Sequence, residues 1–221
     1  MVSLAGSDEE RGIWAGLTLL LAQVDAQSGD TDQAQRLAEA VLAVATADHR
    51  PMLEAQASHL IARLASDPDV AVDLLEHAED LARRAGLLEI AVDAACVRGR
   101  FLAWGSDPAR GARVLGAVVS EVDRRLGEVS GAGTRLDLAV ALRRLDRPAE
   151  AAEVAETGLL MLDEGVADGL RGALGLHASA ASGDLGEHER ALALAAGAAS
   201  DLETVGLWED VAESRRLAAL A

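Results

Sequence analysis

The stretch "QSGDTDQA" at residues 27–34 lies between two long apolar segments. The segment "IWAGLTLLLAQVDA" leads up to it, and "AQRLAEAVLAVA" continues from it. Gly29 and Asp30 interrupt the apolar pattern in the middle. Because glycine and aspartate favour turns, the stretch predicts a helix, a tight turn and a second helix.

Similar breaks recur along the chain. Pro68, Pro108 and Pro148 are each 40 residues apart, and Asp67 and Asp107 directly precede the first two. Asp before Pro indicates a helix start, because the carboxylate caps free amides and proline suits the first helical turn. Asp146 lies two residues before Pro148. The breaks read "ASDPDVA" at 65–71, "GSDPARGA" at 105–112, "LDRPAEAA" at 145–152 and "SGDLGEHERA" at 182–191.

The residues after each break keep the same register. Four positions, at offsets i, i+3, i+4 and i+7, hold small or apolar residues in every unit, and this spacing marks one face of a helix. Repetition at a fixed period of this size indicates stacked helical hairpins. The four sets are Ala34, Ala71, Gly111, Ala151 and Ala191; Leu37, Leu74, Val114, Val154 and Leu194; Ala38, Leu75, Leu115, Ala155 and Ala195; and Val41, Ala78, Val118, Gly158 and Ala198.

Each hairpin is expected to have a first helix, the A helix, and a second, the B helix. We expect A helices near 11–27, 50–65, 87–104, 133–145 and 167–181, and B helices near 31–47, 68–85, 108–126, 147–164 and 187–204. A last helix is expected near 207–220, after a flexible N-terminus at 1–10 and within one repeat domain at 11–221. Gly86, Gly127 and Gly165 are expected to end helices in the left-handed conformation. The stretch 127–133 is expected to be the most flexible connection.

Composition limits the classes of function. Half of the 221 residues are hydrophobic but only 2% are aromatic, so Leu, Val and Ala must build the core. The net charge of −17 disfavours phosphate backbones and anionic membrane surfaces. Cys96 is the single cysteine, which fits a reducing cytoplasm, and we expect a cytoplasmic protein. No apolar run reaches the ~20 residues of a membrane span.

The pattern resembles the tetratricopeptide repeat family. That family has Trp-x2-Leu-Gly-x2-Tyr in its first helix and Ala-x3-Phe in its second. Trp14 and Leu17 match the first motif, whereas Thr18 stands for Gly and Leu21 for Tyr. Ala34, Ala71, Ala151 and Ala191 match the small residue of the second helix, and the Phe is replaced by Ala38, Leu75, Ala155 and Ala195.

The resemblance implies an all-α, right-handed α-solenoid of about five helix-turn-helix repeats plus a C-terminal helix. The period is longer than the family's 34 residues. In this long-period form the chain resembles the C-terminal helical arrays of MalT-type bacterial transcription regulators. In the family, A helices line a concave groove and B helices form the convex back. An unrelated α-helical bundle is the alternative.

Groups that could support catalysis are few. Asp73 and His77 are four residues apart, with Asp80 nearby, but an ordinary polar helix face is favoured over a metal site. Cys96 is expected to be a buried, inert thiol. Packing is expected for the four aromatic residues, although Trp104 could face the groove; the four are Trp14, Phe101, Trp104 and Trp208. We expect no enzyme activity, cofactor or metal.

The charge distribution suggests a binding surface. Within the expected boundaries, acids outnumber arginines on the B helices, and arginines outnumber acids on the A helices. The groove would then be neutral to basic and suit a protein or peptide partner with a carboxylate-bearing segment. The alternative is that the A-helix arginines pair with B-helix acids. The expected partner-binding residues are Gln23, Gln56, Arg63, Arg100 and Arg143.

The sequence thus favours a non-catalytic protein- or peptide-binding scaffold. The alternative is a regulatory or ligand-sensing module of a bacterial transcription regulator. Such a module should accompany a nucleotide-binding or helix-turn-helix segment.

Overall fold

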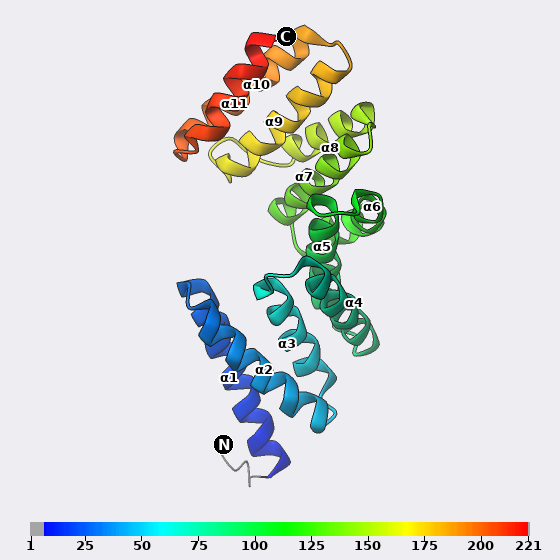
Figure 1. The fold of residues 1–221 in the computed structure, drawn as a ribbon, viewed down its shortest axis with the longest axis vertical. Coiled ribbons are helices and arrows are strands. Elements are labelled where there is room, and N and C mark those ends of the chain that lie inside the picture. Colours follow the sequence, from blue (N-terminus) through cyan, green and yellow to red (C-terminus); the bar gives the residue numbers. More distant parts are fainter. Residues whose placement is uncertain (1–6, 221) are drawn as a thin grey trace. The chain divides into compact units, whose positions relative to one another are not determined.

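The computed structural model describes residues 7–220, which form eleven α-helices and no strand (Figure 1). The expected all-α repeat array is therefore confirmed. None of the described helices is both long and apolar enough to cross a membrane. The helices are α1 Asp8–Ser28, α2 Thr31–Ala47, α3 Pro51–Leu64, α4 Pro68–Arg84, α5 Leu88–Trp104, α6 Pro108–Arg125, α7 Glu128–Arg144, α8 Pro148–Leu160, α9 Asp168–Asp184, α10 His188–Thr204 and α11 Trp208–Leu220.

The contacts divide the chain into two compact units, and the boundary lies inside α5, between Arg98 and Gly99. In the first unit, α1 packs against α2 and α3, α2 against α3, and α3 against α4. In the second unit each helix from α6 to α11 packs against the next, and α9 also contacts α7 and α11. Both units thus consist of helices that contact their neighbours in sequence, with A helices touching the next A helix.

The turn at residues 27–34 shows how the first hairpin forms. Gly29 adopts φ 91°, the left-handed conformation that glycine reaches without a steric penalty. The Asp30 amide donates to the Asp25 carbonyl at 3.0 Å, and the Asp30 side chain accepts from the Gln33 amide at 3.1 Å. One glycine thus ends α1 and the next residue caps α2.

An aspartate side chain also caps the N-terminus of two later B helices, α4 and α6. Asp67 and Asp107 accept backbone amides from Asp69 and Arg110, each at 2.9 Å. Asp146 does not cap α8; it adopts the left-handed conformation at φ 57°, and Arg147 precedes the helix without a side-chain cap. The expected left-handed ends at Gly86 and Gly127 are confirmed, with φ of 74° and 83°. Gly165 is also left-handed, at φ 79°, but it lies in the connection after α8 and does not end that helix.

The register deduced for the B helices is confirmed in all five. The first, third and fourth sets of positions are buried, and the second set is partly buried. Small residues dominate the first set because the two helices of a hairpin meet there. At Gly111 the two helices are close together, since a Cβ atom would lie 2.6 Å from the backbone nitrogen of Ala103.

Four expected boundaries are wrong by three residues or more, and one of them is the end of α9, which lies at Asp184 and not at 181. α1 already begins at Asp8, because the Ser7 side chain and the Glu10 side chain form a reciprocal capping box; residues 1–6 lie outside the described part of the chain. α7 begins at Glu128, so most of the connection expected at 127–133 is helical. Gly131 serves packing there, since a Cβ atom on it would collide with the side chains of Asp123 and Met161. α8 ends at Leu160, four residues early.

The expectation that all four aromatic residues pack in the core is also wrong. Trp104 and Trp208 are 54% and 65% exposed, and Phe101 is partly buried. Trp208 begins the last helix of the array, where no further repeat covers it within the described chain. Trp104 remains exposed because its indole is held on a polar partner, described next.

Candidate functional site

A polar cluster joins three A helices of the second unit around Asp137 of α7. The Asp137 carboxylate is only 6% exposed. It accepts a hydrogen bond from Arg100 Nε at 2.8 Å and another from Trp104 Nε1 at 2.9 Å. Both donors come from the last turns of α5. The buried carboxylate therefore fixes an exposed indole and a 57%-exposed arginine on one surface.

His177 of α9 contacts the same indole. The rings of Trp104 and His177 meet edge to face, with their centroids 6.2 Å apart and an interplanar angle of 87°. Burial, and then the positive charge of Arg143, lowers the pKa of His177 to about 4. The imidazole is therefore neutral at pH 7, and its buried Nδ1 has no hydrogen-bond partner within the described structure.

Two arginines at the end of α7 complete the cluster. Arg144 Nη1 donates to the carbonyls of Ala103 and Gly105 at 2.6 and 2.7 Å, which satisfies free carbonyls at the end of α5. Arg143 Nη2 lies 3.4 Å from Asp184 of α9, a long contact to a half-exposed carboxylate. Arg143 Nε is buried and makes no hydrogen bond in the described chain. Arg143 therefore keeps unused donor capacity.

The five residues expected to bind a partner fall in both units. Arg100 and Arg143 belong to the cluster just described. Arg63 lies in the first unit, is exposed, and forms no ion pair with any described residue. Gln23 and Gln56 are partly buried on α1 and α3, also in the first unit. The structure brings two of the five together.

Three other A-helix arginines do pair with acids of B helices, as the alternative interpretation of the sequence expects. Arg98 pairs with Glu79 at 2.6 Å, and Arg135 forms a two-pronged pair with Asp123 at 2.7 and 2.8 Å. Arg171 lies 3.4 Å from Asp201. Arg100 and Arg143 instead pair with acids on the next A helix, so each alternative describes part of the chain.

The expected excess of arginines on the A helices is not found with the observed boundaries. α1 begins early enough to include Asp8, Glu9 and Glu10, and α9 extends to Asp184. The A helices then hold more acids than arginines. Positive charge is therefore a local property of the α5 and α7 ends and not of the whole A-helix surface.

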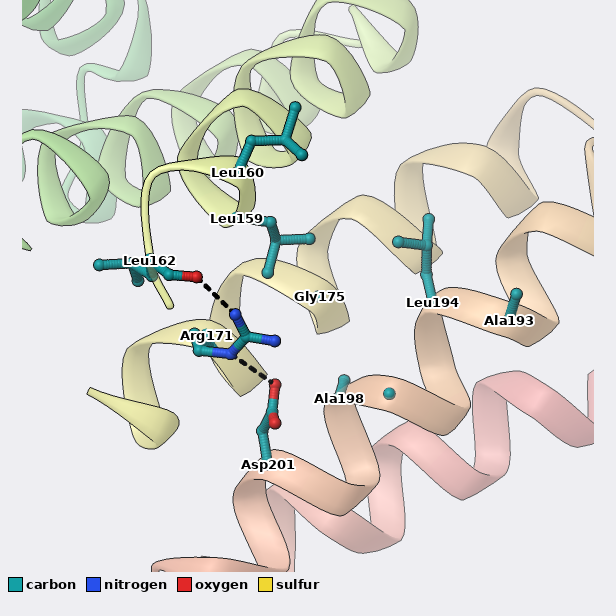
Figure 2. Close-up of a pocket in the computed structure, with 10 residues that line it drawn as sticks. Leu159, Leu160, Leu162, Arg171, Gly175, Ala193, Leu194, Ala198 and Asp201 are labelled. Carbon is teal, nitrogen blue, oxygen red and sulfur yellow. Dashed lines mark hydrogen bonds and ion pairs between the residues drawn. The ribbon is translucent and has the colours of Figure 1, made fainter. Parts of the chain in front are cut away.

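A separate hollow of about 370 Å³ lies between α8, α9 and α10. Figure 2 shows Arg171 inside it, joined to the Leu162 carbonyl at 2.6 Å and facing Asp201. The early end of α8 leaves this part of α9 and α10 uncovered. Gly197 contributes open space, because a Cβ there would meet no atom within 4 Å. The apolar lining comes from Leu159, Leu160, Leu162, Ala193, Leu194 and Ala198.

His77, which was considered as a metal ligand, has its Nε2 3.5 Å from Glu54 of α3. Cys96, expected to be a buried thiol, is only partly buried. No cluster of three or more potential metal ligands occurs among the described residues.

The sequence contained an unused signal for the cluster. Asp137 and His177 are 40 residues apart. Trp104 precedes Arg144 by 40 residues, and Arg144 precedes Asp184 by another 40. These positions are equivalent in successive A helices, as Pro68, Pro108 and Pro148 are in the turns. Comparing polar residues at the repeat period, and not only apolar ones, would have found them.

Comparison with solved structures identifies the fold. BtubC (BKLC) from P. vanneervenii matches with a TM-score of 0.75 and 18% identity, over 90% of this chain and 84% of that one. A Podosopora anserina chain described as a putative kinesin light chain with nearly identical TPR-like repeats matches at 0.69 and 18%, over 92% and 99%. A variant of that chain matches at 0.68 and 19%, over 85% and 94%. No family model and no curated protein sequence matches. The chain therefore has the TPR-like fold.

Proposed function

We propose that the chain is a non-catalytic, cytoplasmic scaffold that binds an extended peptide segment bearing carboxylates. TPR-like arrays offer long surfaces built from successive A helices, which suit extended partners. The single observation behind this proposal is the exposed Trp104 indole, held rigidly by Asp137 and joined to Arg100 and Arg143 through the cluster. Tryptophan and arginine are enriched among the residues that dominate binding energy at interfaces.

The donor groups left over define the chemistry of the partner. Arg100 uses Nε for Asp137, so its two Nη groups remain available. Arg143 makes only one long contact, from Nη2 to Asp184 at 3.4 Å, so its other Nη group remains available. Guanidinium forks bind carboxylates through two parallel hydrogen bonds. In the first unit, we propose Gln23, Gln56 and Arg63 as further partner contacts. The acidic surface elsewhere would repel acidic proteins from other orientations.

The test uses the full chain as bait, first in affinity capture and then against a display library of extended peptides. Trp104→Ala and the double variant Arg100→Gln/Arg143→Gln should each weaken binding of the selected peptide at least about tenfold. The matched controls are Arg83→Gln and Arg125→Gln, because each arginine pairs with a glutamate four residues earlier on its own B helix. These controls should bind like the parent chain. Undiminished binding by a folded double variant would exclude the A-helix site.

The hollow beside α8 supports a second candidate function, a ligand-sensing module of a transcription regulator. Its volume of about 370 Å³ lies within the usual range of small-molecule sites, and its walls are apolar around one partly buried ion pair. Gly197→Leu should fill the space without a backbone clash. A small molecule that raises the melting temperature of the parent chain, but not of Gly197→Leu, would support this function. Stabilisation of both proteins alike would count against it.

A further inference from the structure

Helix α1 has apolar side chains on two opposite faces. Ala15, Leu19 and Ala22 are buried in the core of the first unit. On the opposite side Ile13, Leu17, Leu20 and Val24 are each 58–62% exposed, and Trp14 and Leu21 lie beside them, 36% and 51% exposed. These six residues form the outer α1 face. A helix that is apolar all round is normally covered all round, so this face requires a partner.

The other end of the chain differs. Helix α11 buries Val211 and Ser214, and its exposed positions include Glu209, Asp210, Arg215 and Arg216. Repeat arrays need such polar outer surfaces at their ends to remain soluble. The outer α1 face lacks this property, because no charged residue occurs from Gly12 to Val24.

The spacing of the outer α1 face fits a second copy of itself. Ile13, Leu17, Leu20 and Val24 follow one another at intervals of 4, 3 and 4 residues, the seam that packs against another helix. The pattern reads the same in both directions. In an antiparallel pair, Ile13 would therefore lie opposite Val24 of the second copy, and Leu17 opposite Leu20 of the second copy.

The flanking residues favour the antiparallel arrangement. In that alignment Gly16, whose Cβ position is open, lies opposite Leu21 of the second copy, so a gap faces a large side chain. Glu10 would lie opposite Gln27 and Glu9 opposite Ser28 of the second copy. A parallel pair would place Glu9 beside Glu9 and Glu10 beside Glu10, and it would align the helix dipoles unfavourably.

The area is sufficient for a weak, specific dimer. The six large apolar residues are about half exposed on average and offer on the order of 600 Å² per copy, compared with about 800 Å² per partner in an interface of standard size. Two copies would bury about 1,200 Å², which lies at the lower limit of stable interfaces. We propose that two copies of this chain associate through their outer α1 faces as a two-fold symmetric, antiparallel helix pair.

The first test is sedimentation equilibrium of the parent chain and of Leu17→Lys. The parent should dimerise at micromolar concentrations, and Leu17→Lys should raise the dissociation constant at least about tenfold, because it places two charges in an apolar contact. Leu17 is exposed, so circular dichroism should show an unchanged helix content. Leu160→Lys, at an 89%-exposed leucine of α8, is the control and should dimerise normally.

The second test separates the two helix directions. Leu17→Lys and Leu20→Glu should each be monomeric alone, and an equimolar mixture should form a heterodimer, since position 17 meets position 20 only in the antiparallel pair. A mixture that remains monomeric, while the parent dimerises, would overturn the antiparallel geometry. A parent chain that remains monomeric up to about 100 μM, or dimers unaffected by Leu17→Lys, would overturn the proposal itself. So would a monomeric parent that binds a different protein or lipid vesicles through this face.

Discussion

At the scale of single residues, small side chains set the distance between the paired helices. Ala71 and Ala151 have no exposed surface, and both lie at the first buried position of a B helix. A larger side chain there has no free volume to occupy, because protein interiors are close-packed.

We therefore predict that Ala71→Leu and Ala151→Leu each lower the free energy of unfolding by about 1–3 kcal/mol. Ala149→Leu is the control, since Ala149 is exposed two residues before Ala151 on α8. Denaturant unfolding measures all three. Equal stability of Ala151→Leu and Ala149→Leu would show that the helices do not meet at this position.

His177 provides a prediction on pH. Its pKa is lowered to about 4 in the folded chain, from 6.5, so the unfolded chain takes up a proton first as the pH falls. The contribution of the neutral His177 to the free energy of unfolding is then fully present above about pH 6.5 and is lost as the pH falls towards 4. Between pH 7 and pH 5, the parent should lose about 1–2 kcal/mol more than His177→Gln, which cannot titrate. Parallel pH profiles of the two proteins would contradict a buried, neutral imidazole.

At the scale of an element, two glycines of α6 have opposite effects on the stability of the chain. Gly111 faces the backbone of Ala103, where a Cβ would lie 2.6 Å from nitrogen and 2.8 Å from Cα. Gly116 lies in the same helix, and a Cβ there would meet nothing within 4 Å. The first glycine permits close approach of α5 and α6, whereas the second only weakens the helix.

The same substitution should therefore have opposite effects at the two positions. Gly111→Ala should destabilise the chain by about 1–3 kcal/mol, because backbone atoms cannot move aside as a flexible side chain can. Gly116→Ala should stabilise it by about 0.5–1 kcal/mol, the difference in helix propensity. Thermal melts of the two variants would decide the matter, and shifts of the same sign would refute the close α5–α6 contact.

At the scale of the whole molecule, the two terminal helices differ in the surface that they expose. α11 covers α10 through Val211, which packs with Ala199 and Leu202, and presents charged residues outward. α1 covers its neighbours but presents six apolar side chains. The exposed surface of α11 is suited to contact with water, whereas the exposed surface of α1 is suited to contact with a partner.

Deleting 208–220 should expose Ala199 and Leu202, lower the melting temperature and promote aggregation, because a repeat end without a cap is apolar. Light scattering during heating measures this. Trp208→Ala should have little effect, since that side chain is 65% exposed. A deletion variant as soluble and stable as the parent would show that α11 is not a cap.

Turns and helix faces could be predicted because they depend on neighbours in sequence. Gly29 and Asp30 end one helix and start the next through bonds to residues no more than five positions away. The flexible connection expected at 127–133 could not be corrected from the sequence, because the packing of Gly131 against Asp123 and Met161 depends on segments that meet only in the folded chain.

The sequence by itself determined the all-α repeat, its 40-residue step and the buried face of each B helix, because these follow from local capping and helical periodicity. Only the tertiary structure decided which polar groups meet. Arg98 and Arg100 lie two residues apart on α5, yet one turns back to Glu79 of α4 and the other forward to Asp137 of α7. Two residues along a helix correspond to a rotation of about 200°, so neighbouring arginines face different helices, and their partners become known only once those helices are in place.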